Sequence, residues 1–226
     1  MVVVVILRSA LLEDAGFRHG FAERTADADA IAGALGVSRV IQVKQVHGSR
    51  TLEATDASAE AEADAVVGRS TRDPIAVGVR TADCVAVLVA DVASGDVAAI
   101  HAGWRGVVAG VVQEAILQLR GRAVLAAIGP CIGRCCFEVD RNIAEAIANA
   151  SAGADVLFRR EGDKAWVDLR AAVRAQLSAS ALGAMRVLVD DIGGCTKHEP
   201  TRFHSFRRDG ERSGRMLAAI RSRIPA

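Results

Sequence analysis

The fold is decided by residues 75–106, which read IAVGVRTADCVAVLVADVASGDVAAIHAGWRG. They contain three apolar runs of strand length, Ile75–Val79, Val85–Val89 and Val97–Ile100, which are rich in Val. Runs of this kind are typical of buried strands. No helical segment separates the three runs, so they predict consecutive strands and a mixed α and β pattern, not a regular doubly wound sheet.

Apolar runs and helix caps on either side of this region predict the remaining elements. No repeat, low-complexity tract or flexible linker interrupts them, so we predict an α+β fold with a single domain over residues 1–226. An exposed loop or frayed helix is expected at Ala57–Ala63. Further strands are expected at Val2–Leu7, Val40–Val46, Val124–Ile128 and Met185–Val189, and helices from Asp27 to Gly36, Val107 to Leu119, Asp140 to Ala150, Asp168 to about Gly183 and Gly214 to Ile224.

The composition excludes several classes of protein. The formal net charge of +1 provides no basic field for nucleic acid, and the absence of Tyr argues against a stacking platform for bases. No stretch approaches the roughly 18 apolar residues that span a bilayer, and the short apolar start does not read as a signal peptide. Five cysteines, an odd number with two adjacent, indicate reduced thiols. We therefore expect a cytoplasmic monomer or homodimer with a small-molecule substrate.

Three polar segments lie where predicted strands begin or end: Gln45–Gly48, Thr81–Cys84 and His101–Gly106. His and Cys are good zinc ligands, and a site with three protein ligands leaves the fourth tetrahedral position open. Cys84 and His101 are 17 residues apart on two runs joined by a short turn, so a hairpin-like pairing would bring them together. His47 must arrive from elsewhere, and spacing alone does not place it beside them.

Two other interpretations of these three residues stay open. A lone His or Cys is more often a packed core residue than a ligand. Alternatively, Cys84 is a thiolate nucleophile activated by His47 or His101, with no metal involved.

Other segments allow both a functional and a structural interpretation. Arg105, beside Gly103 and Gly106 at a helix start, suits an anion such as phosphate or is part of a tight turn. Arg207, close to the hydroxyl of Ser205, binds an anionic substrate or lies in a solvated turn.

The cysteines after the apolar run Val124–Ile128 are harder to interpret. Cys131, Cys135 and Cys136 match no zinc knuckle or ribbon spacing, so buried thiols near the pocket are expected. His198-Glu199 precedes Pro200 and has no second His four positions on, which excludes a metalloprotease helix.

Short motifs occur along the chain in one characteristic order: His19-Gly20-Phe21, Gln45-Val46-His47-Gly48, Asp64-Ala65, Thr81-Ala82-Asp83-Cys84, His101-Ala102-Gly103-Trp104-Arg105-Gly106, Gly129-Pro130-Cys131-Ile132-Gly133, Asp168-Leu169, Cys195-Thr196 and Ser205-Phe206-Arg207-Arg208-Asp209. With these motifs the chain resembles the bacterial laccase-domain proteins, also called polyphenol oxidases, purine nucleoside phosphorylases or peptidoglycan editing factors. The resemblance covers almost the whole chain, and its Thr-Ala-Asp-Cys and His-Ala-Gly-Trp-Arg-Gly segments are highly specific.

The resemblance implies an α+β fold with mixed sheets packed face to face and helices outside. It also implies that His47, Cys84 and His101 hold one metal ion. Members are described as acting on adenosine, inosine and methylthioadenosine with phosphate, and as deaminating adenosine. Others are tied to correcting the amino acid on nucleotide-linked cell-wall precursors, and the older laccase label implies copper.

We therefore expect a zinc-dependent purine nucleoside phosphorylase with adenosine deaminase activity. Asp83 is the candidate proton carrier, and the expected substrate-binding residues are Gln45, Arg24, Arg105, Ser205 and Arg207. An amidohydrolase acting on cell-wall precursors is the alternative. A copper polyphenol oxidase is the least favoured alternative, because five His cannot supply the ligands of the usual four-copper set. The run Ala22–Ala26, which contains Arg24, departs from the family pattern.

Overall fold

Alternate residues of the two central strands face different layers, which explains why their apolar runs are continuous. In β7 (Val85–Asp91), Val85, Val87 and Val89 pack toward the helices, whereas Ala86 and Leu88 pack toward a second sheet. β8 (Val97–Ala102) pairs antiparallel with β7 and alternates in the same way. Because side chains alternate between faces along a strand, only strands covered on both sides are apolar throughout.

Two mixed sheets packed face to face form the body of the protein, as seen in a computed structural model that describes residues 3–121, 123–180 and 186–224. The α+β prediction is therefore confirmed. The six-stranded sheet has the order β13 (Arg186–Asp191), β9 (Ala123–Ile128), β7, β8, β5 (Ala65–Gly68) and β4 (Thr51–Glu53). The five-stranded sheet has the order β1 (Ile6–Leu7), β2 (His19–Ala22), β14 (Met216–Arg221), β6 (Ala76–Thr81) and β3 (Val40–Ile41).

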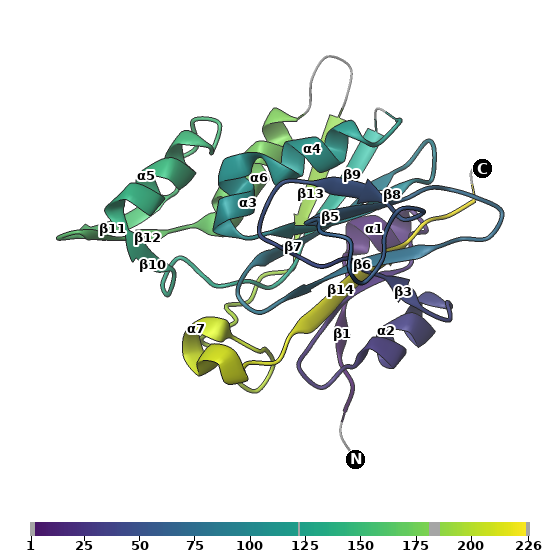
Figure 1. Cartoon of the computed structure of the whole chain (residues 1–226), viewed down its shortest axis with the longest axis horizontal. Helices are drawn as coiled ribbons and strands as arrows, with labels where there is room; N and C mark the ends of the chain where they lie inside the picture. Colours follow the sequence, from purple (N-terminus) through teal and green to yellow (C-terminus); the bar gives the residue numbers. More distant parts are fainter. Residues whose placement is uncertain (1–2, 122, 181–185, 225–226) are drawn as a thin grey trace.

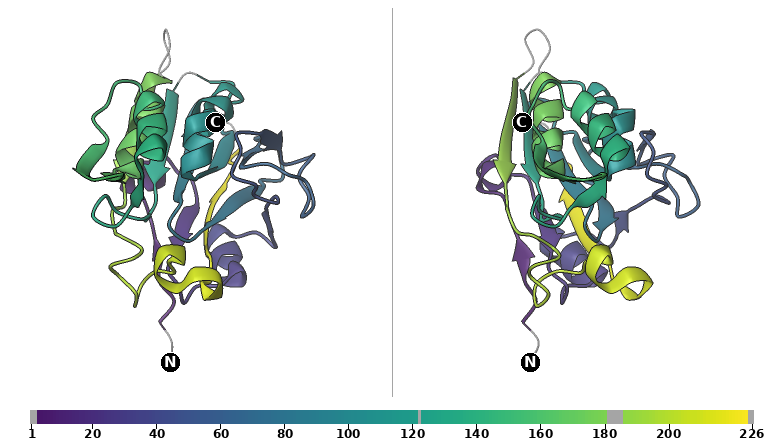
Figure 2. Two further views of the ribbon diagram at one scale, coloured as in Figure 1. Left: turned by 60° about the vertical axis from the view of Figure 1, so that its left-hand side comes forward. Right: turned by 90° about the vertical axis from the view of Figure 1, so that its left-hand side faces the viewer.

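Helices cover the outer face of the six-stranded sheet, and α2 packs on the outer face of the five-stranded sheet against β2 and β14. α3, α4, α5 and α6 lie together at one end of the molecule, whereas α2 and α7 lie at the other (Figures 1 and 2). A small sheet of β10 (Glu138–Asp140), β12 (Lys164–Val167) and β11 (Leu157–Glu161) accompanies α5. The helices are α1 (Ala10–Asp14), α2 (Ala28–Leu35), α3 (Trp104–Ala109), α4 (Val111–Leu117), α5 (Arg141–Asn149), α6 (Leu169–Ala179) and α7 (Phe206–Asp209). Across the described ranges, no helix is long and apolar enough to cross a membrane.

The helix expected from Gly214 to Ile224 is wrong, because Met216–Arg221 forms β14. This strand lies between β2 and β6 and is antiparallel to both. Met, Leu and Ala are good helix formers, but helix propensity is a weak prior that tertiary contacts override. The run is buried on both faces, so its periodicity did not distinguish a strand from a helix.

The boundaries of several other elements also differ from those expected from the sequence. The helix expected over Val107–Leu119 is two helices, α3 and α4, because Gly110 adopts a left-handed conformation with φ of 82° and breaks the run. Of the strand expected at Val40–Val46, only β3 remains, and Lys44 instead forms a bridge with Glu62. Val2 of the first expected strand lies outside the described residues, and among Val3–Leu7 only Ile6–Leu7 forms a strand, β1. Residues 57–63 form a loop, and Gly183 and Met185 lie outside the described residues.

Candidate active site

The β7–β8 pairing brings Cys84 and His101 to the same end of the six-stranded sheet. Cys84 immediately precedes β7, and His101 pairs with Ala86 near the end of β8. The hairpin-like pairing expected from the sequence is therefore confirmed. His101 is buried with 3% of its surface exposed, and Cys84 is partly exposed.

His47 reaches the same place from a loop that Asp64 holds in position. The Asp64 carboxylate accepts hydrogen bonds from the backbone N–H groups of His47 (2.9 Å) and Gly48 (2.6 Å) and lies 2.8 Å from Nδ1 of His101. His47 has a left-handed backbone, with φ of 63°. Its ring packs edge-on against that of His101 with centroids 4.8 Å apart. One ligand atom each of His47, Cys84 and His101 lies within 4.8 Å of the others.

Gly103 leaves room for this group of side chains. A Cβ at position 103 would lie 3.0 Å from the His47 ring and 3.1 Å from Sγ of Cys84. These distances are tighter than ordinary van der Waals contact, so a side chain at this position would displace the candidate ligands. The close approach of His47 and Cys84 therefore explains why position 103 is a glycine.

Cys84 and His101 stabilise each other as a thiolate and an imidazolium. Burial raises the pKa of the Cys84 thiol, but hydrogen bonds from His101 and His47 outweigh it and lower that pKa to about 6. Burial lowers the pKa of His101, but Asp64 and Cys84 outweigh it and raise that pKa to about 9. A thiolate stabilised in this way is both a good metal ligand and a good nucleophile.

The three candidate ligands open onto a cavity of about 600 Å³. Its wall combines apolar and aromatic side chains with guanidinium groups, a lining suited to a small, partly aromatic and anionic ligand. The residues that line it are Val43, Gln45, His47, Arg80, Thr81, Ala82, Asp83, Cys84, His101, Ile132, Phe137, Phe206, Arg207 and Arg215.

Asp83 lies in the wall but is held by two neighbours. Its carboxylate accepts hydrogen bonds from the Thr196 hydroxyl and from the backbone N–H of Arg207, both at 2.6 Å. Its backbone is left-handed, with φ of 92°. Asp83 thus joins three loops around the cavity.

The other expected substrate residues are divided between the cavity and the surrounding structure. Gln45 and Arg207 line the cavity, although the Gln45 amide pairs with the backbone of Arg80 in both directions at 2.8 Å. Ser205 is fully buried and caps α7. Arg24 is exposed and donates to the carbonyl of Pro200, and neither Arg24 nor Ser205 lines the cavity.

Arg105 is also exposed and stacks on Trp104, with its guanidinium carbon 4.5 Å from the ring centroid. It does not line the cavity.

Sequence reasoning missed residues that the structure brings to the site. Asp64 appears in the sequence only as part of the Asp64-Ala65 motif, which gives it no role. A charged residue directly before the apolar run Ala65–Val67 is a signal that could have marked it as a functional residue. Arg80 and Arg215 line the cavity without belonging to any quoted motif, so no local pattern identified them.

Comparison with known proteins identifies the family. The sequence model of a family described as multi-copper polyphenol oxidoreductase laccase matches residues 23–223. The chain belongs to this family. Among its members, the purine nucleoside phosphorylase YfiH of Shigella flexneri is 36% identical over 189 residues, covering 81% of this chain and 74% of YfiH. The adenosine deaminase RL5 of an unknown prokaryotic organism is 39% identical over 153 residues, covering 65% of this chain and 58% of RL5.

Solved structures of similar proteins share the fold. A Neisseria meningitidis protein superposes with a TM-score of 0.81 at 26% identity, covering 97% of this chain and 99% of the other. YlmD from Geobacillus stearothermophilus has a TM-score of 0.80 at 23% identity, covering 96% of both chains, and therefore supports the fold alone.

The family description implies a metal, and the donor set of this laccase-like chain fits one. Two imidazoles and one thiolate suit a single borderline or soft cation such as zinc, with one coordination position left for water or substrate. Asp64 on Nδ1 of His101 is the carboxylate–histidine arrangement that orients a metal-binding imidazole.

Proposed function

We propose that this chain is a zinc-dependent purine nucleoside phosphorylase that acts on adenosine, inosine and methylthioadenosine, with adenosine deamination as a second activity. The observation that carries the proposal is the opening of His47, Cys84 and His101 onto a cavity that also contains aromatic and guanidinium groups. Relatives named as purine nucleoside phosphorylases and as an adenosine deaminase support it.

The cavity offers a place for each part of the substrates. Phe137 and Phe206 provide aromatic faces for a purine, and Arg80, Arg207 and Arg215 provide positive charge for phosphate. Asp83 is the candidate proton carrier, and Asp64 keeps His47 and His101 in place. A zinc ion bound by His47, Cys84 and His101 would supply Lewis acidity and lower the pKa of a coordinated water.

The alternative proposal is an amidohydrolase acting on a nucleotide-linked cell-wall precursor, since such a substrate also carries an aromatic base and phosphates. Product analysis separates the two: incubation of adenosine or inosine with phosphate should release free base and ribose 1-phosphate. Release of an amino acid from a cell-wall precursor, with nucleosides left intact, would favour the amidohydrolase. We rank a copper polyphenol oxidase last, because only two of the five His line the cavity.

A paired measurement on Cys84 separates a ligand from a nucleophile. If Cys84 is a ligand, Cys84→Ala should lose zinc and activity together, and so should His47→Ala and His101→Ala, because two ligands hold zinc poorly. If Cys84 is a nucleophile, Cys84→Ala would lose activity and keep any bound zinc, and chelation would spare the wild type. Full activity in demonstrably metal-free wild type would refute the zinc mechanism.

A further inference from the structure

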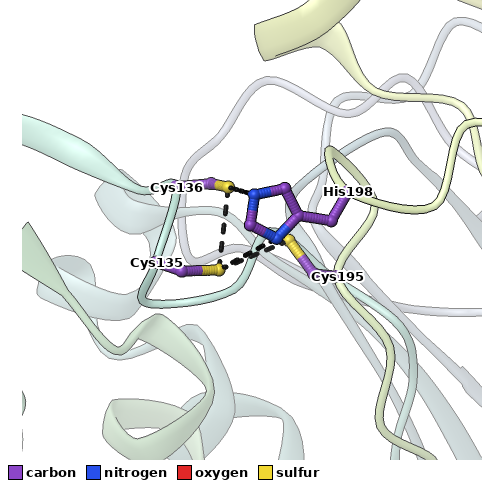
Figure 3. A group of neighbouring side chains, drawn as sticks. All are labelled: Cys135, Cys136, Cys195 and His198. Carbon is purple, nitrogen blue, oxygen red and sulfur yellow. Dashed lines mark hydrogen bonds between the residues drawn. The ribbon is translucent and has the colours of Figure 1, made fainter.

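Two loops bring three cysteines and a histidine together outside the cavity. Cys135 and Cys136 belong to the loop that follows β9, and Cys195 and His198 belong to the loop that follows β13 (Figure 3). Nearly 60 residues separate the two pairs in the sequence. One ligand atom from each of the four residues lies within 4.8 Å of the other three.

The distances from the Cys135 sulfur to its neighbours in this cluster match those of a tetrahedral metal site. Zn–S bonds of about 2.3 Å and a Zn–N bond of about 2.0 Å place two sulfurs about 3.8 Å apart and a sulfur and a nitrogen about 3.5 Å apart. Sγ of Cys135 lies 3.6 Å from that of Cys136 and 3.9 Å from that of Cys195. Nδ1 of His198 lies 3.5 Å from Sγ of Cys135, and Nε2 lies 3.2 Å from Sγ of Cys136, so either ring nitrogen is close enough to the sulfurs to serve as the fourth ligand.

The surroundings of Cys195 also suit a bound thiolate. The backbone N–H of Gly133 donates to its sulfur at 3.2 Å, and a Cβ at position 133 would lie within 3.2 Å of both the Cys195 and Cys135 sulfurs. The Cys195 backbone N–H is held by the Glu199 carboxylate at 2.8 Å. Cys135 and His198 are exposed, so an ion has access from solvent.

We propose that Cys135, Cys136, Cys195 and His198 form a second metal site, a closed Cys₃His zinc site with a structural role. Four protein ligands complete the tetrahedron and leave no open position for substrate, unlike the group of three at the cavity. The sequence favoured buried thiols here, but Cys135 is exposed and the set is complete only when both loops are in place.

The position of the cluster indicates what the ion would stabilise. The first loop carries Ile132 and Phe137, which line the cavity, and the second carries Thr196, whose hydroxyl holds Asp83. A zinc ion would tie these loops together and so support the cavity wall. This inference does not depend on the proposed function of the cavity.

The test measures zinc per chain in a Cys84→Ala background, which separates this cluster from the cavity ligands. Elemental analysis of the full-length variant should find about one zinc that Cys84→Ala/Cys195→Ser lacks. The matched control Cys84→Ala/Cys131→Ser removes a buried thiol outside the cluster and should keep that zinc. Equal zinc in the two cysteine-to-serine variants would overturn the proposal, whatever the metal content of the cavity.

Thiol labelling of the wild type gives a second measurement if the double variant does not fold. In freshly purified protein, the exposed Cys135 should resist alkylation until a zinc chelator is added, as located by peptide mass spectrometry. Immediate alkylation of Cys135, or a chain mass showing the loss of two hydrogens from a disulfide, would overturn the proposal.

Discussion

Asp64 orients two of the candidate ligands at once, although it does not point into the cavity as they do. It is fully buried, lies against the His101 ring and binds the backbone of the loop that carries His47. Burial raises its pKa, but His101 and the backbone N–H groups outweigh this and lower the pKa. The carboxylate is therefore ionised and available as an acceptor at neutral pH.

Asp64→Asn should weaken zinc binding about 10- to 100-fold, because the amide lacks the charge and one of the acceptors that position the two imidazoles. Competition with a chromophoric chelator measures this affinity. Glu62→Gln is the matched control, since the Glu62 side chain forms an exposed ion pair with Lys44 and lies outside the group of candidate ligands. Equal zinc affinities for Asp64→Asn and the control would remove Asp64 from the site.

Two arginines are candidates for binding phosphate, Arg80 in the cavity wall and Arg105 outside it. If phosphate binds in the cavity, Arg80→Met should raise the KM for phosphate about tenfold, as expected for losing one hydrogen bond to a charged group. Arg105→Met should leave it unchanged, because Arg105 stacks on Trp104 outside the cavity. Steady-state phosphorolysis at varied phosphate measures both, and the reverse ranking would locate phosphate at the start of α3.

At the scale of elements, one buried carboxylate fastens the ends of β5 and β8. Asp96 precedes β8, is fully buried, and accepts hydrogen bonds from the Ser70 backbone N–H (2.8 Å) and from Arg69 and Arg120. Burial raises the pKa of Asp96, but these three donors outweigh it and lower the pKa below its ordinary value. β8, which carries His101, is thus fixed to β5 at the end opposite the cavity.

Asp96→Asn should lower the free energy of unfolding by about 2 kcal/mol at pH 7, since Arg120 loses its charged partner and Arg69 is left with Glu53 alone. A carboxyl group whose pKa is lower in the folded state stabilises the fold at pH values above its unfolded-state pKa of about 4. This stabilisation is lost as the pH falls through the folded-state pKa. The difference from wild type should therefore shrink as the pH falls below about 4.

Urea denaturation at several pH values measures this difference. Asp163→Asn is the control, because Asp163 is exposed in the turn between β11 and β12 and makes no ion pair among the described residues. A pH-independent difference between wild type and Asp96→Asn would contradict the assigned ionic role.

At the scale of the whole molecule, the last strand joins the two ends of the chain. β14 pairs with β2 on one side and with β6 on the other, and its residues pack against the six-stranded sheet. The five-stranded sheet is therefore complete only after residues about 200 positions apart have met. Such long-range pairing slows folding, because the cost of closing the loop precedes the gain from contacts.

Ile220→Ala should cost about 3 kcal/mol of unfolding free energy, because Ile220 is fully buried between the two sheets. Ile224→Ala, four positions later, should change it by less than about 0.5 kcal/mol, since Ile224 is 58% exposed. Urea denaturation compares the two variants. Equal losses would show that β14 does not pack as described.

Local sequence alone determined the parts of this protein that depend on neighbouring residues. Continuous apolar runs predicted β7, β8 and β9, because strands covered on both faces must be apolar throughout. The helix from Asp27 to Gly36 was also correct, since its cap and its left-handed end are local features. The family resemblance pointed to His47, Cys84 and His101, which the fold brings together.

Only the tertiary structure decided features that depend on residues far apart in the chain. β14 is a strand because β2 and β6 offer hydrogen bonds on both sides, which outweighs the helix propensity of its residues. Arg80 and Arg215 reach the cavity from opposite halves of the sequence. Cys135, Cys136, Cys195 and His198 meet because β9 and β13 are parallel neighbours, so the loops that follow them emerge at the same edge of the sheet.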